Sequence, residues 1–331
     1  MLWLSGTEMT DTERKIARAV VVGGAGFIGS HLVRELAATG IRATSIDRDP
    51  RGRLDHTGAV SVQADVAAGD RVLTEQLADD GLDAVFITVG TGFVPRSLEH
   101  PQADLENNVF PVLAVLEALR GRTTPPVVVY LSSAAVYGEA RSVPMSERHP
   151  TDPLSPYGVS KLAAEHYLRL YHLLYGIPTL SLRLFSVFGP GQRKLVVHDL
   201  LVRLLSGEDP LVVRGAPEVT RDFVYVSDVA RCALRLAAAA PAQGEPYNVC
   251  SGIGTTLADL VRQMRLACGS DAELQFAGDL RSGDPVRFVG DTGAASKLGA
   301  GGGSKLVVGL EATVAWLRGL QPGFQRVHDL R

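Results

Sequence analysis

Cysteine and lysine are scarce in this chain, and it has no long apolar run. The three cysteines, Cys232, Cys250 and Cys268, lack metal-ligand spacing, which predicts reduced thiols and no metal site. The apolar stretches, including the one at the N-terminus, are too short for a signal peptide or a membrane span. We therefore expect a cytoplasmic protein that does not interact with membranes.

An excess of charge of one sign is also lacking. The 33 basic and 36 acidic residues leave a net charge of −3, so the composition gives no sign of nucleic-acid binding. The basic residues are mostly arginine, which we attribute to genomic composition. With 46% hydrophobic residues in 331, the chain can form two domains, or one large α/β domain with an added lobe.

From residue 18 onward, short β-branched runs alternate with longer amphipathic segments. Segments 102–120 and 158–175 are typical of helices, whereas the apolar runs are typical of buried strands. The main runs are ARAVVVGG, RATSIDRD, LDAVFITVG, PPVVVYLSS and IPTLSLRLFSVFG. Their alternation predicts an α/β fold with a doubly wound parallel sheet, a Rossmann domain over residues 18–185.

The composition changes after the Gly-Pro-Gly at residues 189–191. Helices at 195–207 and 309–319, with short elements between them, predict a smaller C-terminal lobe for the substrate over 186–331, some segments of which return to the sheet. The glycine-rich stretch 299–305 is expected to be a loop. Residues 1–17 are expected to form a loose tail, with Met9 as an alternative start.

A glycine-rich turn stands between the first strand and the first helix. In VVVGGAGFIGSHLV, the glycines at 23, 24, 26 and 29 allow backbone N–H groups to approach a pyrophosphate at the helix N-terminus. Asp47, at the end of the next strand, can accept hydrogen bonds from a ribose and would repel a 2′-phosphate, which favours NAD. Arg48 leaves NADP open, because an arginine can pair with that phosphate. Asp65 is either an adenine ligand or a helix N-cap.

A tyrosine and a lysine stand four residues apart in SPYGVSKLAAEHYLRLY. Helical spacing places Tyr157 and Lys161 on one face. A tyrosine has a reference pKa of about 10, and a nearby ammonium group favours its phenolate, three units corresponding to about 4 kcal/mol. Ser133, at the end of an earlier strand, can relay or orient a substrate proton. The alternative is an exposed tyrosine beside a solvated lysine.

Seven segments together resemble a known family. They are GGAGFIGSHL, SSAAVYG, PYGVSK, LRLFSVFGPGQ, TRDFVYVSDVA, YNVCSG and RSGDPVRF, in this order between about residues 20 and 318. The chain resembles the extended short-chain dehydrogenase/reductases, specifically the NAD-dependent nucleotide-sugar epimerases and dehydratases of the UDP-glucose 4-epimerase type.

This resemblance implies roles for individual residues. Tyr157 would be the base, Lys161 its electrostatic partner and a ribose ligand, and Ser133, rather than Ser132, the substrate-facing hydroxyl. Asn108 would support the active-site loop, or else act as an N-cap or turn residue. Phe185 would flank the nicotinamide, or else belong to the core. The expected cofactor contacts are Gly23, Gly26, Phe27, Ile28, Gly29, Asp47, Asp65, Val66, Val89, Gly90, Tyr157, Lys161 and Phe185.

On the substrate side, the resemblance implies a nucleoside diphosphate sugar with arginines on its phosphates. The expected contacts are Ser133, Tyr157, Ser186, Arg221 and Arg281. Asp222 would orient Arg221, and Asp228 would cap a helix. The family's frequent HLAA is here ITVG, Ile87 to Gly90, so contacts there are expected from the backbone. Ser186 replaces an asparagine and Arg214 an aromatic residue, which leaves the nucleotide base open.

The residues after Ser133 bear on the reaction. Relatives that dehydrate the sugar carry an acidic pair there, and this chain has Ala134 and Ala135, neither of which can move a proton. A C4 epimerase acting on a UDP-linked hexose or hexuronic acid is therefore favoured. A 4,6-dehydratase, a 4-ketoreductase and a non-enzymatic NAD sensor are the alternatives. The family often forms homodimers, here through helices 102–120 and 158–175.

Overall fold

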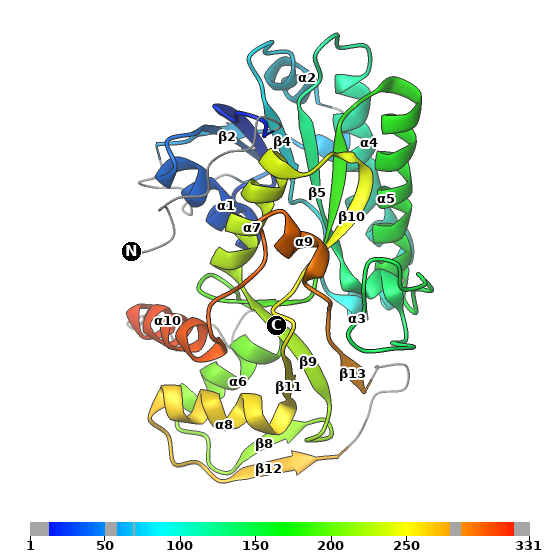
Figure 1. Cartoon of the computed structure of the whole chain (residues 1–331). Coiled ribbons are helices and arrows are strands. Elements are labelled where there is room, and N and C mark those ends of the chain that lie inside the picture. Colours follow the sequence, from blue (N-terminus) through cyan, green and yellow to red (C-terminus); the bar gives the residue numbers. More distant parts are fainter. Residues whose placement is uncertain (1–12, 50–57, 69, 279–285, 321–331) are drawn as a thin grey trace.

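The computed structural model describes residues 13–49, 58–68, 70–278 and 286–320. A seven-stranded parallel sheet, in the order β10-β6-β5-β4-β1-β2-β3, forms its larger part (Figure 1). Strand order runs outward from β1 in both directions, so the predicted doubly wound α/β fold is confirmed. The strands are β1 (Arg18–Val22), β2 (Arg42–Asp47), β3 (Val60–Gln63), β4 (Ala84–Ile87), β5 (Val127–Ser133), β6 (Thr179–Leu184) and β10 (Gln243–Val249).

Helices cover both faces of this sheet, as near-continuously apolar strands require. In Figure 1, α1 and α7 lie on one face and α4 and α5 on the other. Leu32, Leu36 and Leu236 belong to the first core, and Val112 and Leu168 to the second. The helices are α1 (Phe27–Ala38), α2 (Arg71–Leu77), α3 (Val94–Glu99), α4 (Pro101–Leu119), α5 (Pro156–Tyr175) and α7 (Val226–Ala239).

The smaller lobe has its own core. A four-stranded sheet and a parallel pair of strands pack with three helices around Phe188, Leu201 and Leu260. Its elements are β7 (Ser186–Phe188), α6 (Leu195–Leu205), β8 (Leu211–Arg214), β9 (Thr220–Tyr225), β11 (Gly254–Thr256), α8 (Leu257–Cys268), β12 (Leu274–Ala277), β13 (Arg287–Phe288) and α10 (Leu306–Gly319), and the short α9 (Gly293–Lys297) packs against β10. The return of α7 and β10 to the large sheet agrees with expectation.

The apolar run predicted as one strand over IPTLSLRLFSVFG is two. β6 pairs with β5 as far as Leu184, and after Phe185 the chain continues as β7, which pairs with β9 of the smaller lobe. The N–H of Phe185 donates to the carbonyl of Val249, 3.1 Å away, where β10 ends. Phe185 therefore stands where the chain passes from one sheet to the other.

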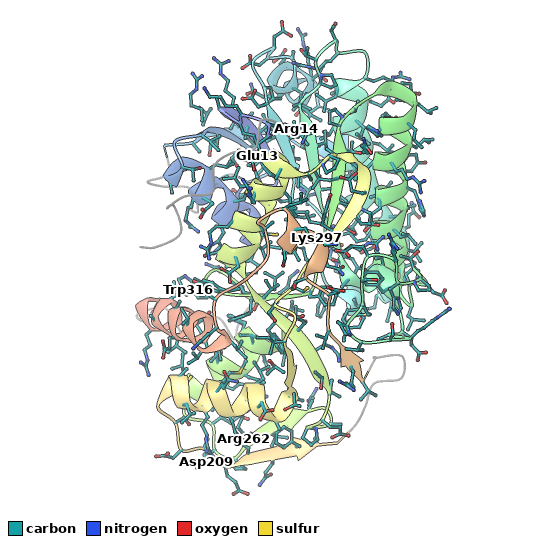
Figure 2. All side chains as sticks on the ribbon, viewed as in Figure 1. Glu13, Arg14, Asp209, Arg262, Lys297 and Trp316 are labelled. Atoms are coloured by element: carbon teal, nitrogen blue, oxygen red, sulfur yellow. The ribbon has the colours of Figure 1, made fainter. Side chains whose placement is uncertain are left out.

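Residues 13–17, expected to lie in a loose tail, make defined contacts instead. Glu13 forms an ion pair of 2.7 Å with Arg235 of α7, and the N–H of Ala17 donates to Asp83 at 2.8 Å. Figure 2 shows the labelled Glu13 and Arg14 on the molecule's upper part. The expectation is wrong for these residues because they contact α7 and the residue that precedes β4.

The glycine-rich stretch 299–305 is a loop, as predicted. Asp228 was expected to cap a helix, but α7 has no side-chain cap, and Asp228 lies in its first turn. Its carboxylate accepts hydrogen bonds from the N–H and the hydroxyl of Ser304, at 2.6 and 3.1 Å, and pairs with Arg231. The acid therefore fixes the glycine-rich loop to α7.

No helix among the described residues is long and apolar enough to cross a membrane.

Candidate functional site

Backbone hydrogen bonds and close backbone contacts fix the shape of the glycine turn between β1 and α1. Gly23 has φ +88° and donates its N–H to the carbonyl of Ile46 at 2.7 Å. A Cβ on Gly29 would stand 2.2 Å from the carbonyl oxygen of Gly23, so the helix can approach the turn only with glycine there. Gly26 is the N-cap of α1 and offers no side chain, which leaves the first N–H groups of the helix open to a ligand.

This turn forms one wall of a cavity of about 200 Å³ at the carboxyl ends of the strands. Seven predicted cofactor contacts line it: Gly23, Gly26, Asp47, Asp65, Val66, Val89 and Gly90. Thr91 and Asn107 also line it and were not predicted, and Thr88 lines it within the ITVG segment, from which backbone contacts are expected. The other six predicted contacts, Phe27, Ile28, Gly29, Tyr157, Lys161 and Phe185, are not among the residues that line it. Gly29 lies beneath the turn, and Ile28 packs on the core.

Two aspartates of the cavity are positioned by short-range hydrogen bonds. Asp47, the last residue of β2, accepts from the N–H of Ala25 at 3.1 Å and from that of Asp49 at 3.3 Å. Asp65 accepts from the N–H of Ala67 at 3.2 Å and so caps the 3₁₀ turn over Val66–Ala68. Asp65 is thus both a cap and part of the cavity wall, and the two alternatives are compatible.

Ser133, Tyr157 and Lys161 come together where β5 ends and α5 begins. Ser133 Oγ accepts the N–H of Ala135 at 3.2 Å, and α5 is started by Pro156 and the Ser155 cap. The Lys161 ammonium donates to the carbonyl of Leu131 at 2.9 Å and lies 5.9 Å from the Tyr157 ring centroid. Lys161 is only 5% exposed. The alternative of a solvated lysine is therefore wrong.

Burial dominates the electrostatics of this pair. It raises the pKa of Tyr157, and a hydrogen bond with the Ser133 hydroxyl opposes this. It also lowers the pKa of Lys161 to about 8, opposed by the negative charges of Asp104 and Glu165. We expected the ammonium to favour the phenolate, but in this structure the desolvation of Tyr157 outweighs such effects. The two shifts therefore move the pKa values of Tyr157 and Lys161 apart, and that of the lysine becomes the lower.

Asn108 supports the segment that follows β4. It is fully buried within α4, so the alternative of an N-cap is wrong. Its Nδ2 donates to the carbonyl of Asp104 at 2.9 Å, and a Cβ on Gly90 would stand 2.3 Å from its Oδ1. In the ITVG segment, the hydroxyl of Thr88 donates to the carbonyls of Val22 and Gly23, both at 2.9 Å. The segment is thus held from both sides.

A buried ionic network lies next to the group formed by Ser133, Tyr157 and Lys161. Ser132 donates to Glu165 at 2.6 Å, and Glu165 forms an ion pair of 2.7 Å with Arg183. The side chain of Ser132 is thereby engaged in the interior, which agrees with the choice of Ser133. The sequence analysis missed Glu165 and Arg183. One signal was available, because Glu165 follows Lys161 by four residues and so shares its helix face.

Of the predicted substrate residues, Ser133 and Tyr157 belong to the larger domain, and Ser186 and Arg221 belong to the smaller lobe. Ser186 and Arg221 are half-buried on the neighbouring strands β7 and β9, and Arg281 lies outside the described residues. Arg214 is exposed at the end of β8. Phe185 is buried against Phe288, with ring centroids 5.4 Å apart, as the core alternative requires. Its contact with a nicotinamide, and the substrate roles, stay predictions.

Asp222 was expected to orient Arg221, but its contacts are different. The fully buried carboxylate accepts the N–H and hydroxyl of Ser251, both at 2.7 Å, and the N–H groups of Gly252 and Gly290, at 2.9 and 3.3 Å. Burial raises its pKa, and these hydrogen bonds oppose the rise. Asp222 therefore joins β9 to two distant turns. We call this group of contacts the Asp222 clasp.

The described residues contain no group of three or more His, Cys, Asp or Glu side chains that could hold a metal ion. Cys232, Cys250 and Cys268 are buried free thiols, as predicted.

Comparisons with known proteins agree with this geometry. The chain is similar to a putative UDP-glucose 4-epimerase from Methanocaldococcus jannaschii, with 32% identity over 305 residues, 90% of this chain and 98% of that protein. It is also similar to a dTDP-glucose 4,6-dehydratase from Xanthomonas campestris, with 32% identity over 255 residues, 71% of each. The crystal structure of a Thermus thermophilus UDP-glucose 4-epimerase complex with NAD matches with a TM-score of 0.81 and 30% identity, covering 92% of this chain and 99% of that one. A profile of the family described as NAD dependent epimerase/dehydratase matches residues 19–250, and the chain belongs to this family.

Proposed function

We propose that the chain is an NAD-dependent nucleotide-sugar 4-epimerase, which inverts C4 of a UDP-linked hexose or hexuronic acid through a 4-keto intermediate. Residues 18–185 bind the dinucleotide, and 186–331 mainly bind the nucleotide sugar. One observation carries the proposal. Ser133, Tyr157 and Lys161 lie close together beside the cavity, and the two residues after Ser133 are alanines.

The residues of the cavity fit NAD. The turn at Gly23 and Gly29 leaves no room for a Cβ, and Gly26 leaves the N-terminus of α1 open, as a pyrophosphate needs. Asp47 stands at the strand end where a ribose is recognised, and its charge opposes a 2′-phosphate. Arg48 also lines the cavity, and therefore NADP is the competing cofactor to test.

In the proposed reaction, Tyr157 takes the proton of the C4 hydroxyl, and Ser133 orients that hydroxyl. NAD, when bound, accepts the C4 hydride and gives it back to the opposite face of the sugar. Tyr157 then returns its proton to the C4 oxygen. Lys161 offsets the negative charge of the phenolate and binds the ribose. Each turnover begins and ends with the same redox state, so no external reductant is consumed.

A dehydratase needs more acid–base groups than this site offers. Removal of the C5 proton and of the C6 hydroxyl calls for a further base and a further acid. Ala134 is buried and Ala135 half-buried in the 3₁₀ turn after Ser133, so neither supplies them. Of the nearby carboxylates, Glu165 is engaged by Arg183 in the interior, and Asp104 is buried in α4 and accepts a hydrogen bond from Thr91. This supports epimerisation, although a dehydratase is among the similar proteins.

The test is incubation of the purified protein with UDP-, dTDP- and GDP-linked hexoses and hexuronic acids, without added cofactor. We expect the C4 epimer of a UDP-sugar, observed by anion-exchange chromatography and NMR. Tyr157→Phe should lower turnover by about 10²- to 10⁴-fold, the range of general acid–base catalysis. A 6-deoxy-4-keto product, a requirement for NADPH, or an active Tyr157→Phe variant would overturn the proposal.

We also propose a homodimer formed through α4 and α5, which pack side by side (Figure 1). Leu170, Leu173 and Leu174 of α5 and Phe110 of α4 are exposed apolar side chains, and Leu173 is 66% exposed. Leu173→Glu should convert a dimer to a monomer in light-scattering chromatography. Leu266→Glu is the matched control, because Leu266 of α8 is 77% exposed on the other lobe. A wild-type monomer would contradict the proposal.

A further inference from the structure

Asp104 is a buried acid next to the proposed active site. It lies in the first turn of α4, is 4% exposed, and accepts a hydrogen bond from the Thr91 hydroxyl at 3.0 Å through Oδ1. Within the described residues, its second oxygen, Oδ2, has no hydrogen-bond partner and the carboxylate forms no ion pair. A half-satisfied buried carboxylate is costly unless a nearby positive charge compensates it.

Lys161 is the cation in position to compensate this charge. Lys161 Nζ lies 3.4 Å from the place that a Cβ on Gly90 would occupy, and Thr91, the next residue, is the partner of Asp104. The charges of Asp104 and Glu165 both raise the pKa of Lys161. Glu165 is already paired with Arg183 at 2.7 Å, which cancels much of its charge. Asp104 is therefore the unpaired carboxylate that acts on the ammonium.

The hydrogen bond from Thr91 also connects Asp104 to the segment over the site. Gly90 and Thr91 line the dinucleotide cavity, and a Cβ on Gly92 would stand 3.9 Å from the Tyr157 hydroxyl. Asn108, one turn after Asp104 on α4, contacts the same segment, because its Nδ2 donates to the Thr91 hydroxyl at 3.4 Å. One carboxylate thus contacts a segment that approaches both Lys161 and Tyr157, and its charge acts on the lysine.

We propose that Asp104 is a positioning residue of the active site: it anchors the 90–92 segment through Thr91 and supplies the fixed negative charge that keeps the Lys161 ammonium protonated beside Tyr157. This inference rests on the roles of Tyr157 and Lys161 in the proposed function. The groups that face Lys161 are Asp104 from α4, Tyr157 and Glu165 from α5, and Tyr130 from β5, whose ring centroid lies 4.7 Å from Nζ.

The test compares three variants that separate charge from anchoring. Asp104→Asn keeps an oxygen for Thr91 and removes the charge, Asp104→Glu keeps the charge, and Thr91→Val keeps the carboxylate but removes its hydrogen bond. The main readout is the ultraviolet titration of Tyr157, taken as the difference between each protein and its Tyr157→Phe counterpart. It needs no turnover, so it gives an answer even if the proposed reaction is wrong.

Asp104 raises the pKa of Tyr157 as well as that of Lys161. Removal of its charge should therefore move the tyrosine titration, and the pH dependence of kcat/KM, to lower pH in Asp104→Asn. Thr91→Val should lower kcat several-fold with the titration midpoint unchanged, and Asp104→Glu should keep the midpoint. A role confined to folding would lower activity without moving any midpoint.

An unchanged or higher midpoint in Asp104→Asn, or an equal shift in Thr91→Val, would overturn the proposal. Thermal unfolding and NAD affinity are measured on each variant to verify that it is folded. Asp104→Ser, which exchanges the carboxylate for a small hydroxyl, takes the place of Asp104→Asn if the amide variant does not fold. The same downward shift is expected of it, and its absence would overturn the proposal too.

Discussion

The dinucleotide side and the substrate side of the proposed site are held in different ways. On the first, Asp47 ends β2 and Ser133 ends β5 of the same parallel sheet, and their hydrogen bonds reach residues that are close in sequence or in register. On the second, Arg221 lies on a short strand whose place depends on Asp222, which joins β9 to residues 251–252 and 290. The dinucleotide side is therefore fixed by local structure, and the substrate side by one buried long-range clasp.

This difference has a consequence for specificity. A substitution at a strand end of the large sheet should leave the surrounding strands in place. A substitution in the Asp222 clasp should move several segments of the smaller lobe together. Gly290 places the clasp against Phe185, where the chain passes between the two sheets, because a Cβ on Gly290 would stand 2.7 Å from that ring. We expect cofactor choice and substrate affinity to respond separately to substitutions, and the variants below test this separation.

The largest effect is expected from Lys161→Met, at the boundary between the two sides. The Lys161 ammonium favours the Tyr157 phenolate, and it loses its proton as pH rises through a pKa of about 8. In the wild type, the contribution of the ammonium to kcat/KM should therefore be present at neutral pH and be lost as pH rises through about 8. Without the ammonium, this loss should be absent, and kcat/KM should rise only toward the raised pKa of Tyr157.

At neutral pH, Lys161→Met should lower kcat/KM by about 10²- to 10³-fold, within the range of general acid–base effects. Lys305→Met, in the smaller lobe just before α10, is the control for loss of a lysine. A pH profile of Lys161→Met that matches the wild type would show that Tyr157 titrates independently of it. A group other than Lys161 would then have to favour the Tyr157 phenolate.

A smaller effect is expected from Asp222→Asn, which leaves part of the clasp unpaired. The amide can accept from Ser251 but presents N–H groups to those of Gly252 and Gly290. The free energy of unfolding should fall by about 1–3 kcal/mol, the cost of unsatisfied buried donors. The KM for the nucleotide sugar should rise about tenfold, equivalent to about 1.4 kcal/mol, while NAD affinity stays unchanged.

Urea unfolding and steady-state kinetics measure both quantities for Asp222→Asn. Asp271→Asn, an exposed acid of the same lobe, is the matched control and should change neither. If Asp222→Asn weakened NAD binding as much as substrate binding, the two sides would be coupled. The comparison between a local and a long-range side would then be wrong.

The same contrast explains how much could be predicted from the sequence. The order of strands and helices, the glycine turn, Asp47 and the Tyr157–Lys161 spacing are local patterns, and the structure brings these residues together around the sheet. Asp222, Asp228 and Asp104 carry no such pattern. Their roles depend on partners such as Gly290 and Ser304, up to 76 residues away, which no local spacing shows.

Two further differences have the same origin. The split of one apolar run into β6 and β7 follows from pairing with β5 on one side and β9 on the other, and hydrophobicity is alike in both. The net pKa of Tyr157 depends on how far burial exceeds the local hydrogen bond, which only the packed structure determines. In contrast, Asn108 was recognised from the family resemblance, and its buried contacts with the 90–91 segment agree with that role.

The smallest effect is expected from Asp47→Asn, on the locally fixed side. The amide oxygen can still accept from the N–H of Ala25, so the turn should keep its shape, but the charge that opposes a 2′-phosphate is lost. We expect the ratio of NAD to NADP affinity to fall about tenfold, or about 1.4 kcal/mol, with the KM for the nucleotide sugar unchanged. Calorimetric titration with both dinucleotides measures the ratio, and Asp49→Asn, an exposed acid two residues further on, is the control. An unchanged ratio would mean that Arg48, and not the carboxylate, determines which cofactor binds, because both side chains line the same cavity.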